Sequence, residues 1–292
     1  MTLPGQIALG TAQFGLPYGI ANQGGQISHD EAARILGRAW AAGVDMLDTA
    51  VAYGDSESRL GNIGVEKWHV ISKIPPVPDE CSDIETWMQE TVTSLMKRLK
   101  TDQLYGLLLH DPSQLSQDIG DEIYQALLAI KKQGAISKIG ISIYNPDELP
   151  PICHRFEIDI VQAPLNIIDR RLIDSGWATA LHDRGIEVHA RSIFLQGLLL
   201  MQQDQRHPYF RQWDGLWTAW QNWLHESDLT PVQACIGFAI AQAGVDRVIV
   251  GIDSLAQLED ILENTDTPID DIPPGIGSDD IDLVNPSRWK LN

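Results

Sequence analysis

The chain has 292 residues, of which 43% are hydrophobic and 21% charged, a composition that excludes a disordered or collagen-like protein. Aspartate and glutamate total 40 against 21 lysine and arginine, which gives a formal net charge of −19. Because nucleic acids and anionic membrane surfaces repel a protein of this charge, we expect neither as a partner.

The start of the chain and its cysteines indicate where in the cell the protein is expected. Residues 1–10 lack the basic start and long apolar stretch of a secretory signal, and no apolar run approaches the roughly 20 residues of a membrane span. The three cysteines lie far apart and form no C-x-x-C pair, so neither a disulfide framework nor a zinc site is predicted. We expect a cytoplasmic protein without a metal site.

Short aliphatic runs and longer amphipathic stretches alternate along the chain. The runs predict eight strands, at 7–9, 44–47, 69–72, 104–109, 138–142, 159–162, 187–190 and 247–250. Apolar residues three or four apart predict helices between them, at 29–42, 84–99, 121–133, 172–184 and 232–243. This alternation predicts one α/β domain over residues 1–292, a (β/α)8 TIM barrel. An open doubly wound sheet is the alternative, although no G-x-G-x-x-G follows the first strand.

Two segments are longer than ordinary connections. Residues 201–214 are polar and lead into a predicted helix with tryptophans at 213, 217, 220 and 223. We expect these tryptophans to pack the helix onto the barrel, with a lid over the substrate as the alternative. From about residue 265 the chain is irregular and acidic, and we expect it to wrap the surface, with a partner-binding tail as the alternative.

Polar residues follow three consecutive predicted strands. Asp48 ends the second strand, and Tyr53 lies in the loop after it. Lys73 ends the third strand, and His110 ends the fourth. Each residue alone has a structural explanation, but active sites of parallel barrels lie at the carboxyl ends of the strands. Their joint occurrence on one rim therefore predicts a catalytic site.

These four residues suit the protonation of an oxygen that is becoming negatively charged. Tyr53 would be the acid, and Lys73 would lower the pKa of its phenol from the ordinary value of about 10. Asp48 would hold Lys73 protonated, and His110 would orient the substrate oxygen. A carbonyl that receives a hydride fits this chemistry, and the hydride must come from a cofactor because no side chain supplies one.

The sequence resembles aldo-keto reductases over nearly its whole length, in the motifs LGTAQFG, DTAVAYG, SKIPP, LLLHDP, VQAPLN and VIVGIDSLAQLEDIL. The resemblance implies an NAD(P)H-dependent oxidoreductase that interconverts a small carbonyl compound (an aldehyde, ketone or sugar) and an alcohol. It implies a catalytic tetrad of Asp48, Tyr53, Lys73 and His110. It also implies contacts with the nicotinamide and pyrophosphate of the cofactor, made by Ser142, Gln162, Arg191, Ser192 and Leu198. Arg191 stands where an aromatic residue usually stacks on the nicotinamide.

The segment after the eighth strand bears on which nucleotide is used. Where many family members carry basic residues for the 2′-phosphate of NADP(H), this chain has Gly251 and Gln257. Asp253 would repel that phosphate and accept a hydrogen bond from an unmodified ribose. Ser254 and Gln257 match a capping box, whose helix N-terminus would face the adenosine. The family's habit favours NADP(H), with NAD(H) as the alternative, and Arg247 or Lys290 could restore a phosphate contact.

Two other functions stay open at this stage: a non-catalytic barrel that binds dinucleotide and partners, and a sugar isomerase or lyase that uses Tyr53 and Lys73. The expected substrate pocket is built from Phe14, Tyr18, the Tyr53 loop and residues 201–214. Within that last segment, Arg206, His207 and Arg211 could contact an anion or hydroxyl. The oligomeric state does not follow from the sequence.

Overall fold

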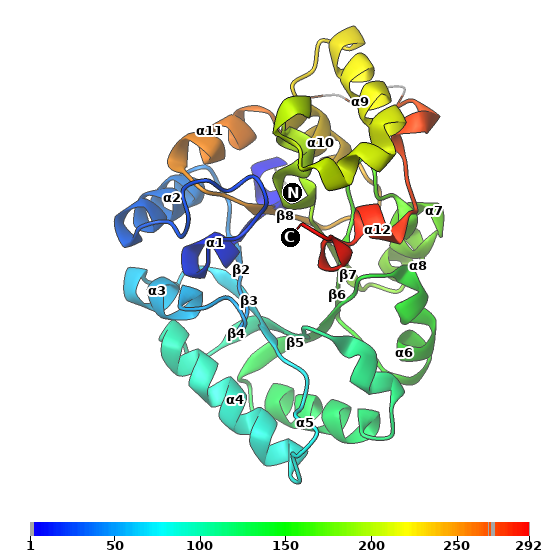
Figure 1. Ribbon diagram of the computed structural model, residues 1–292. Helices are drawn as coiled ribbons and strands as arrows, with labels where there is room; N and C mark the ends of the chain where they lie inside the picture. Colours follow the sequence, from blue (N-terminus) through cyan, green and yellow to red (C-terminus); the bar gives the residue numbers. More distant parts are fainter. Residues whose placement is uncertain (1–2, 268, 270–271, 292) are drawn as a thin grey trace.

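Eight parallel strands close into a barrel in chain order, with β1 paired to both β2 and β8 (Figure 1). This computed structural model describes residues 3–267, 269 and 272–291. The strands are β1 (Ile7–Gly10), β2 (Met46–Asp48), β3 (His69–Ile74), β4 (Leu104–Leu109), β5 (Ile136–Ser142), β6 (Ile160–Pro164), β7 (Glu187–Arg191) and β8 (Arg247–Gly251). The predicted barrel is confirmed, and its closure rules out the open sheet.

Helices ring the barrel on the outside (Figure 1). The longer ones are α2 (His29–Ala41), α3 (Ser56–Ile63), α4 (Ile84–Leu99), α5 (Gly120–Lys132), α6 (Leu149–Arg155), α8 (Trp177–Asp183), α9 (Asp214–Glu226), α10 (Pro231–Ile240) and α11 (Leu255–Glu263). The short ones are α1 (Ala12–Gly15), α7 (Arg171–Asp174) and α12 (Ile281–Val284). The single helix predicted over 172–184 is wrong: it is divided into α7 and α8, because Gly176 between them adopts a left-handed φ of 78°.

Several 3-10 turns complete the secondary structure. They are η1 (Leu3–Gln6), η2 (Pro112–Ser116), η3 (Pro146–Glu148), η4 (Leu195–Leu200), η5 (Gln203–Gln205), η6 (Pro208–Trp213), η7 (Pro274–Ile276) and η8 (Pro286–Arg288). Three of them, η4 to η6, occupy the long connection between β7 and α9. Among the described residues, no helix is long and apolar enough to cross a membrane.

The apolar core has two layers. The inner layer fills the barrel with one side chain from each of six strands, namely Ala8, Met46, Ile71, Leu108, Ile160 and Ile249. Gly106 leaves room for this layer, since a Cβ there would lie 2.8 Å from Cδ1 of Ile160 on a non-adjacent strand and that side chain would have to shift. The outer layer packs the strands against the helices. Because both faces of each strand are buried, the strands read as continuous apolar runs in the sequence.

Polar groups occupy the end of the barrel where the strands begin. Glu187 at the start of β7 accepts hydrogen bonds from Tyr105 (2.6 Å) and Lys138, and also contacts the His189 ring (3.2 Å). Burial opposes the charge of this carboxyl, but these bonds lower the pKa of Glu187 to about 2. We call Glu187 and these three partners the basal cluster.

Arg247 lies at the same end of the barrel. It begins β8 and donates to Asp45 at 2.8 Å and to the Gly5 carbonyl. The suggestion that it restores a cofactor phosphate contact is therefore wrong, because Gly251 and the segment after it lie at the opposite end of β8.

The connection after β7 and the end of the chain pack on one another beside α9 (Figure 1). Trp217, Trp220 and Trp223 of α9 are at most 4% exposed, which confirms their packing role. Trp213 precedes the helix and donates its indole N–H to Asp280 at 3.0 Å. The chain beyond residue 265 is thus less irregular than expected, with η7, α12 and η8 and a buried Leu283. Two acidic residues of this segment, Asp270 and Asp271, lie outside the described residues.

Candidate active site

Three neighbouring strands bring the four predicted catalytic residues to one rim of the barrel. Asp48 is the last residue of β2, Lys73 is the next to last of β3, and His110 follows β4 directly. Tyr53 lies in the turn between β2 and α3. Because the three strands are parallel and adjacent in the barrel, their carboxyl ends lie side by side.

The four side chains are in contact range. The ammonium of Lys73 donates to Oδ2 of Asp48 at 2.6 Å and to the Thr49 carbonyl at 3.1 Å. Its Nζ lies 3.5 Å from the hydroxyl oxygen of Tyr53. The rings of Tyr53 and His110 meet edge to face, with centroids 6.0 Å apart. The structure therefore brings an acid, an ammonium, a phenol and an imidazole together as the sequence predicts.

Burial governs the proton affinities of this group. It raises the pKa of Tyr53 well above its ordinary value, and the charge of Asp48 raises it further, while Arg191 opposes both. The prediction that Lys73 sets a lowered pKa for the phenol is wrong here, because the cost of burying a phenolate next to Asp48 exceeds the effect of the nearby cations. Tyr53 therefore holds its proton at neutral pH, as a proton donor must.

The lysine and the histidine are affected in the same way. Burial lowers the pKa of Lys73, and the carboxylate of Asp48 opposes that shift. For His110, burial and then the charges of Lys73 and Arg191 lower the pKa to about 4. The imidazole is therefore neutral at pH 7, and it can hydrogen-bond to a carbonyl oxygen without competing as the acid.

Gln162 links the tetrad to the other side of the barrel. It lies on β6, is 1% exposed, and donates through Nε2 to Oδ1 of Asp48 at 2.7 Å. Its Oε1 is buried without a hydrogen-bond partner among the described residues. An unpaired buried acceptor of this kind suits an external N–H donor, such as the amide of a nicotinamide. Ser142 of β5 lies beside Gln162 in the strand register.

Two glycines position the Tyr53 backbone, a feature that sequence reasoning missed. A Cβ on Gly15 would lie 1.8 Å from the Tyr53 carbonyl oxygen, so α1 approaches this turn closely. Gly54 follows Tyr53 with a left-handed φ of 57°, and a Cβ there would meet the Gly15 carbonyl at 2.4 Å. The glycines of the LGTAQFG and DTAVAYG motifs thus allow α1 and the Tyr53 turn to pack together.

Arg191 faces the same site from the end of β7. Its guanidinium donates to the Ile143 carbonyl at 2.8 Å and to the Ser192 hydroxyl at 3.1 Å. Its Cζ lies 4.5 Å from the centroid of the Tyr144 ring. The charge of Arg191 acts on the pKa of Tyr53, Lys73 and His110, which agrees with a position near the tetrad. Tyr144, which holds the guanidinium plane, was not predicted.

The loop after β7 has an unusual backbone. Ser192, Leu195 and Gln196 adopt left-handed φ values of 60°, 48° and 54°, which cost energy in residues other than glycine. The Gln196 carbonyl accepts from the Ile20 amide at 3.1 Å, so the loop is tied to the segment after α1. Leu198 is fully buried, so its side chain belongs to the core and offers no surface to a ligand.

The residues after β8 form a capped helix start. Ser254 accepts from the Gln257 amide at 3.3 Å, which confirms the cap. The reciprocal half of the predicted capping box is wrong, because Gln257 accepts from the Asp253 amide at 2.7 Å instead of from Ser254. Asp253 also accepts from Asn22 at 3.0 Å.

Gly251 adjoins a second unpaired acceptor. A Cβ on Gly251 would lie 2.6 Å from Nε2 of Gln13, so glycine leaves space for that amide. Gln13 is 9% exposed, and its Oε1 has no partner among the described residues. Sequence reasoning missed this residue because glutamine carries no catalytic signature.

The expected substrate pocket is only partly correct. Phe14 is 1% exposed and belongs to the core, so its assignment to the pocket wall is wrong. Tyr18 and Tyr144 are 41% and 40% exposed. Tyr144 raises the pKa of Tyr53, and Tyr53 in turn raises the pKa of Tyr18, which agrees with places at the rim for both. The basic residues predicted in the segment 201–214 line a separate cavity, which is described below.

Comparison with known proteins gives consistent results. The model of the aldo/keto reductase family matches residues 6–272. D-threo-aldose 1-dehydrogenase from a Pseudomonas species is 27% identical, over 94% of this chain and 95% of that protein. L-galactose dehydrogenase from Arabidopsis thaliana is 23% identical, over 81% of this chain and 78% of that protein. The holo form of an aldo-keto reductase from Bacillus halodurans has the same fold, with a TM-score of 0.71 and 21% identity over 91% of this chain and 88% of that one.

Proposed function

Because the chain belongs to the aldo/keto reductase family and is therefore an oxidoreductase, we propose that it interconverts a carbonyl and an alcohol with Tyr53 as the proton donor. Membership of a reductase family makes the two alternative functions, a non-catalytic barrel and an isomerase or lyase, less favoured. The observation that carries the proposal is the contact series from Asp48 through Lys73 to Tyr53, with neutral His110 beside the phenol.

In the reducing direction, the substrate carbonyl oxygen accepts hydrogen bonds from the Tyr53 hydroxyl and the His110 ring. A nicotinamide dinucleotide, when bound, supplies the hydride to the carbonyl carbon. As negative charge develops on the oxygen, Tyr53 transfers its proton to it, and the phenolate left behind is stabilised by Lys73 and Arg191. In the oxidising direction, the Tyr53 phenolate takes the proton from the alcohol.

Residues of this chain suit the dinucleotide along its length. Gln162 offers its unpaired Oε1 to the nicotinamide amide, beside Ser142 on the next strand. Arg191 offers a guanidinium plane, already fixed on Tyr144, for stacking. The Ser192–Leu198 loop would contact the pyrophosphate, and the segment of Gly251, Asp253, Ser254 and Gln257 would contact the adenosine.

The adenosine segment bears on the choice between NADP(H) and NAD(H). Residues 251–263 contain no lysine or arginine, and Asp253 places a carboxylate among them. A carboxylate repels a 2′-phosphate and accepts from a free ribose hydroxyl, so this segment by itself favours NAD(H). Binding of NADP(H), the family's common cofactor, would require a basic group from another segment.

The substrate class that we propose is an aldose or a similar hydroxylated aldehyde. The relatives with named sugar substrates support this class, since both act as sugar dehydrogenases by name. Tyr18 and Tyr144 offer exposed aromatic faces near Tyr53, and aromatic faces pack well against the C–H surface of a sugar ring.

Two measurements test the function. The purified protein is incubated with a panel of aldoses and NAD⁺ or NADP⁺, and with simple aldehydes and the reduced nucleotides, while absorbance of the reduced nicotinamide is followed. Binding of NADH and NADPH is measured in parallel by quenching of tryptophan fluorescence. Turnover that disappears in Tyr53→Phe, with nucleotide binding intact, supports the proposal. Absence of binding by either nucleotide at millimolar concentration contradicts it.

A further inference from the structure

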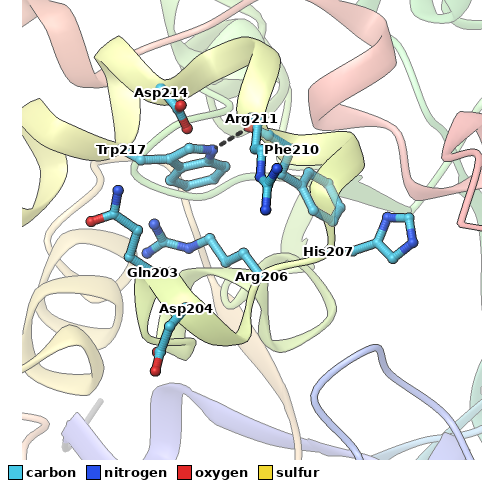
Figure 2. A pocket seen from close by; sticks show the side chains of 8 residues that line it. All are labelled: Gln203, Asp204, Arg206, His207, Phe210, Arg211, Asp214 and Trp217. Carbon is cyan, nitrogen blue, oxygen red and sulfur yellow. Dashed lines mark hydrogen bonds between the residues drawn. The ribbon is translucent and has the colours of Figure 1, made fainter.

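A second site lies in the long connection between β7 and α10. There a cavity of about 210 Å³ is enclosed by η5, η6 and the first turn of α9 (Figure 2). Its wall includes Arg206, Arg211 and Trp217, and none of the residues that line it belongs to the tetrad. The volume is several times the roughly 30 Å³ that one water molecule occupies in the liquid.

Arg206 is the buried cation of this cavity. The residue is 9% exposed, and its Cζ lies 4.4 Å from the centroid of the Trp217 ring. Nη2 donates to the Met201 carbonyl at 2.9 Å, but Nε and Nη1 are buried and have no partner among the described residues. No carboxylate of the described chain lies within 4.0 Å of this guanidinium. A buried cation with unpaired N–H groups costs several kcal/mol unless an anion or other acceptor meets it.

Two other basic residues, Arg211 and His207, line the cavity, and both are exposed. In Figure 2 the side chain of Arg211 extends from η6 toward the gap between Trp217 and Arg206. His207 accepts from the Tyr209 amide through Nδ1 at 3.2 Å, which leaves its other nitrogen free to carry the hydrogen. The Trp217 ring forms one wall of the cavity. Its position is fixed because its indole N–H donates to the Phe210 carbonyl at 2.9 Å.

Two carboxylates also line the cavity, Asp204 and Asp214. Both residues are exposed, and neither forms an ion pair with Arg206 or Arg211. In Figure 2 the Asp204 carboxylate points away from Trp217. The charge of Asp214 acts on the Arg206 guanidinium and opposes the lowering of its pKa by burial, but it does not pair with the unpartnered Nε and Nη1.

We propose that this cavity binds a phosphate group, with the unpaired N–H groups of Arg206 as the anchor and Arg211 as the second contact. Two guanidinium groups suit a tetrahedral oxyanion, since each offers a planar set of N–H donors. The phosphate has two sources, a free phosphate or phosphate ester and the 2′-phosphate of NADP(H). Only the second source rests on the proposed function.

The first experiment uses inorganic phosphate alone. Calorimetric titration and thermal unfolding are carried out with phosphate and with chloride at matched ionic strength. Phosphate should raise the Tm of the wild type, because a ligand that binds only the folded state stabilises it. Arg206→Met keeps an apolar stem over Trp217 and removes the guanidinium, so it should weaken phosphate binding by about tenfold or more. Arg34→Met, an exposed arginine of α2, is the matched control and should bind as the wild type does.

The second experiment separates the sources. If the phosphate comes from the cofactor, Arg206→Met should weaken NADPH binding about tenfold or more and leave NADH binding unchanged. If the source is a free phosphate, the ratio of the two nucleotide affinities should be the same in both proteins. The proposal is overturned if wild-type protein ignores phosphate at tens of millimolar and the nucleotide ratio is also unchanged.

Two further points keep the test decisive. If Arg206→Met fails to fold, Arg206→Lys replaces it in the same titrations, because lysine keeps the charge but lacks the planar set of N–H donors. The titrations of the wild type with phosphate need no variant at all. None of the phosphate titrations involves turnover or Tyr53. A protein that binds phosphate but reduces no carbonyl would therefore contradict the proposed function and leave this inference standing.

Discussion

The Lys73 ammonium is 0.9 Å closer to Asp48 than to Tyr53, at 2.6 Å against 3.5 Å. The ammonium therefore forms its shorter hydrogen bond with the carboxylate of Asp48, a residue that is 3% exposed. Its contact with the Tyr53 hydroxyl is longer. The buried ion pair with Asp48 holds the positive charge of Lys73 in one place. That charge is therefore already next to the Tyr53 oxygen when the phenol gives up its proton.

Replacement of Tyr53 by phenylalanine should remove the proton donor and little else. We expect kcat for carbonyl reduction to fall by about 10²- to 10⁴-fold, which is the usual contribution of a general acid. Nucleotide binding, followed by tryptophan fluorescence, should stay within about twofold, since the hydroxyl forms no contact that we assign to the nucleotide. Turnover equal to that of the wild type would refute the role of Tyr53.

Lys73→Met should affect both stability and activity. It leaves the Asp48 carboxylate buried without its cation, which typically costs about 3–5 kcal/mol of unfolding free energy. The double variant Asp48→Asn with Lys73→Met removes both charges and should recover most of that loss in urea unfolding. It should not recover kcat. Full recovery of turnover in the double variant would show that the pair acts only in folding.

The pKa of His110, lowered to about 4, predicts two pH dependences. Turnover should show no inflection from His110 between about pH 5.5 and 8, because the ring stays neutral there.

In the unfolded chain histidine titrates near 6.5, so between pH 6.5 and 4 the unfolded state binds a proton that the folded state does not. Stability should therefore fall as the pH drops through this window, on the order of 2 kcal/mol. Urea unfolding at several pH values should show a flatter dependence for His110→Gln. An equal slope in both proteins would contradict the lowered pKa.

The unpaired oxygen of Gln162 predicts a binding defect. Gln162→Met keeps the length of the side chain but removes the acceptor and the donor to Asp48. If the oxygen receives the nicotinamide amide, the Kd for NADH and NADPH should rise about 5- to 15-fold, which corresponds to one net hydrogen bond. Gln133→Met, at an exposed position after α5, is the control. Unchanged affinity for both nucleotides would exclude this contact.

Two helical glycines provide a matched pair for the fold. A Cβ on Gly61 of α3 would lie 2.1 Å from the Arg98 carbonyl oxygen of α4, whereas a Cβ on Gly37 of α2 would meet nothing within 4 Å. Gly61→Ala should destabilise by about 1–3 kcal/mol, since two helix backbones must separate. Gly37→Ala should stabilise by about 0.5–1 kcal/mol through helix propensity. Urea unfolding measures both, and equal shifts in the two variants would show that α3 and α4 are not in close contact.

The barrel could be predicted because its strands are apolar on both faces, which makes each one a distinct run in the sequence. The rim could be predicted because polar residues stand where those runs end, as at Asp48 and His110. The break between α7 and α8 was not visible, because glycine is tolerated within helical patterns and only the backbone angle at Gly176 shows where the chain turns.

Other features of the site depend on packing between distant segments. The direction of the Tyr53 pKa shift follows from how deeply the phenol is buried, which residue types do not reveal. The free oxygens of Gln13 and Gln162 become visible only when all neighbouring donors are known. Gly15 reads as an ordinary loop residue until its contact with the Tyr53 backbone is seen.

The basal cluster around Glu187 and the rim around Tyr53 lie at opposite ends of the strands, which are about 20 Å long in the case of six-residue β4. They share no side chain. Libraries of random substitutions should show that the two regions have different effects on protein abundance and on turnover. Substitutions at the base should lower protein abundance in cells while the surviving molecules keep their turnover. Substitutions at exposed rim positions such as Tyr18 and Tyr144, unlike those in the buried Asp48–Lys73 pair, should yield abundant protein with altered preferences, so new specificities can be selected there without first adding stability elsewhere.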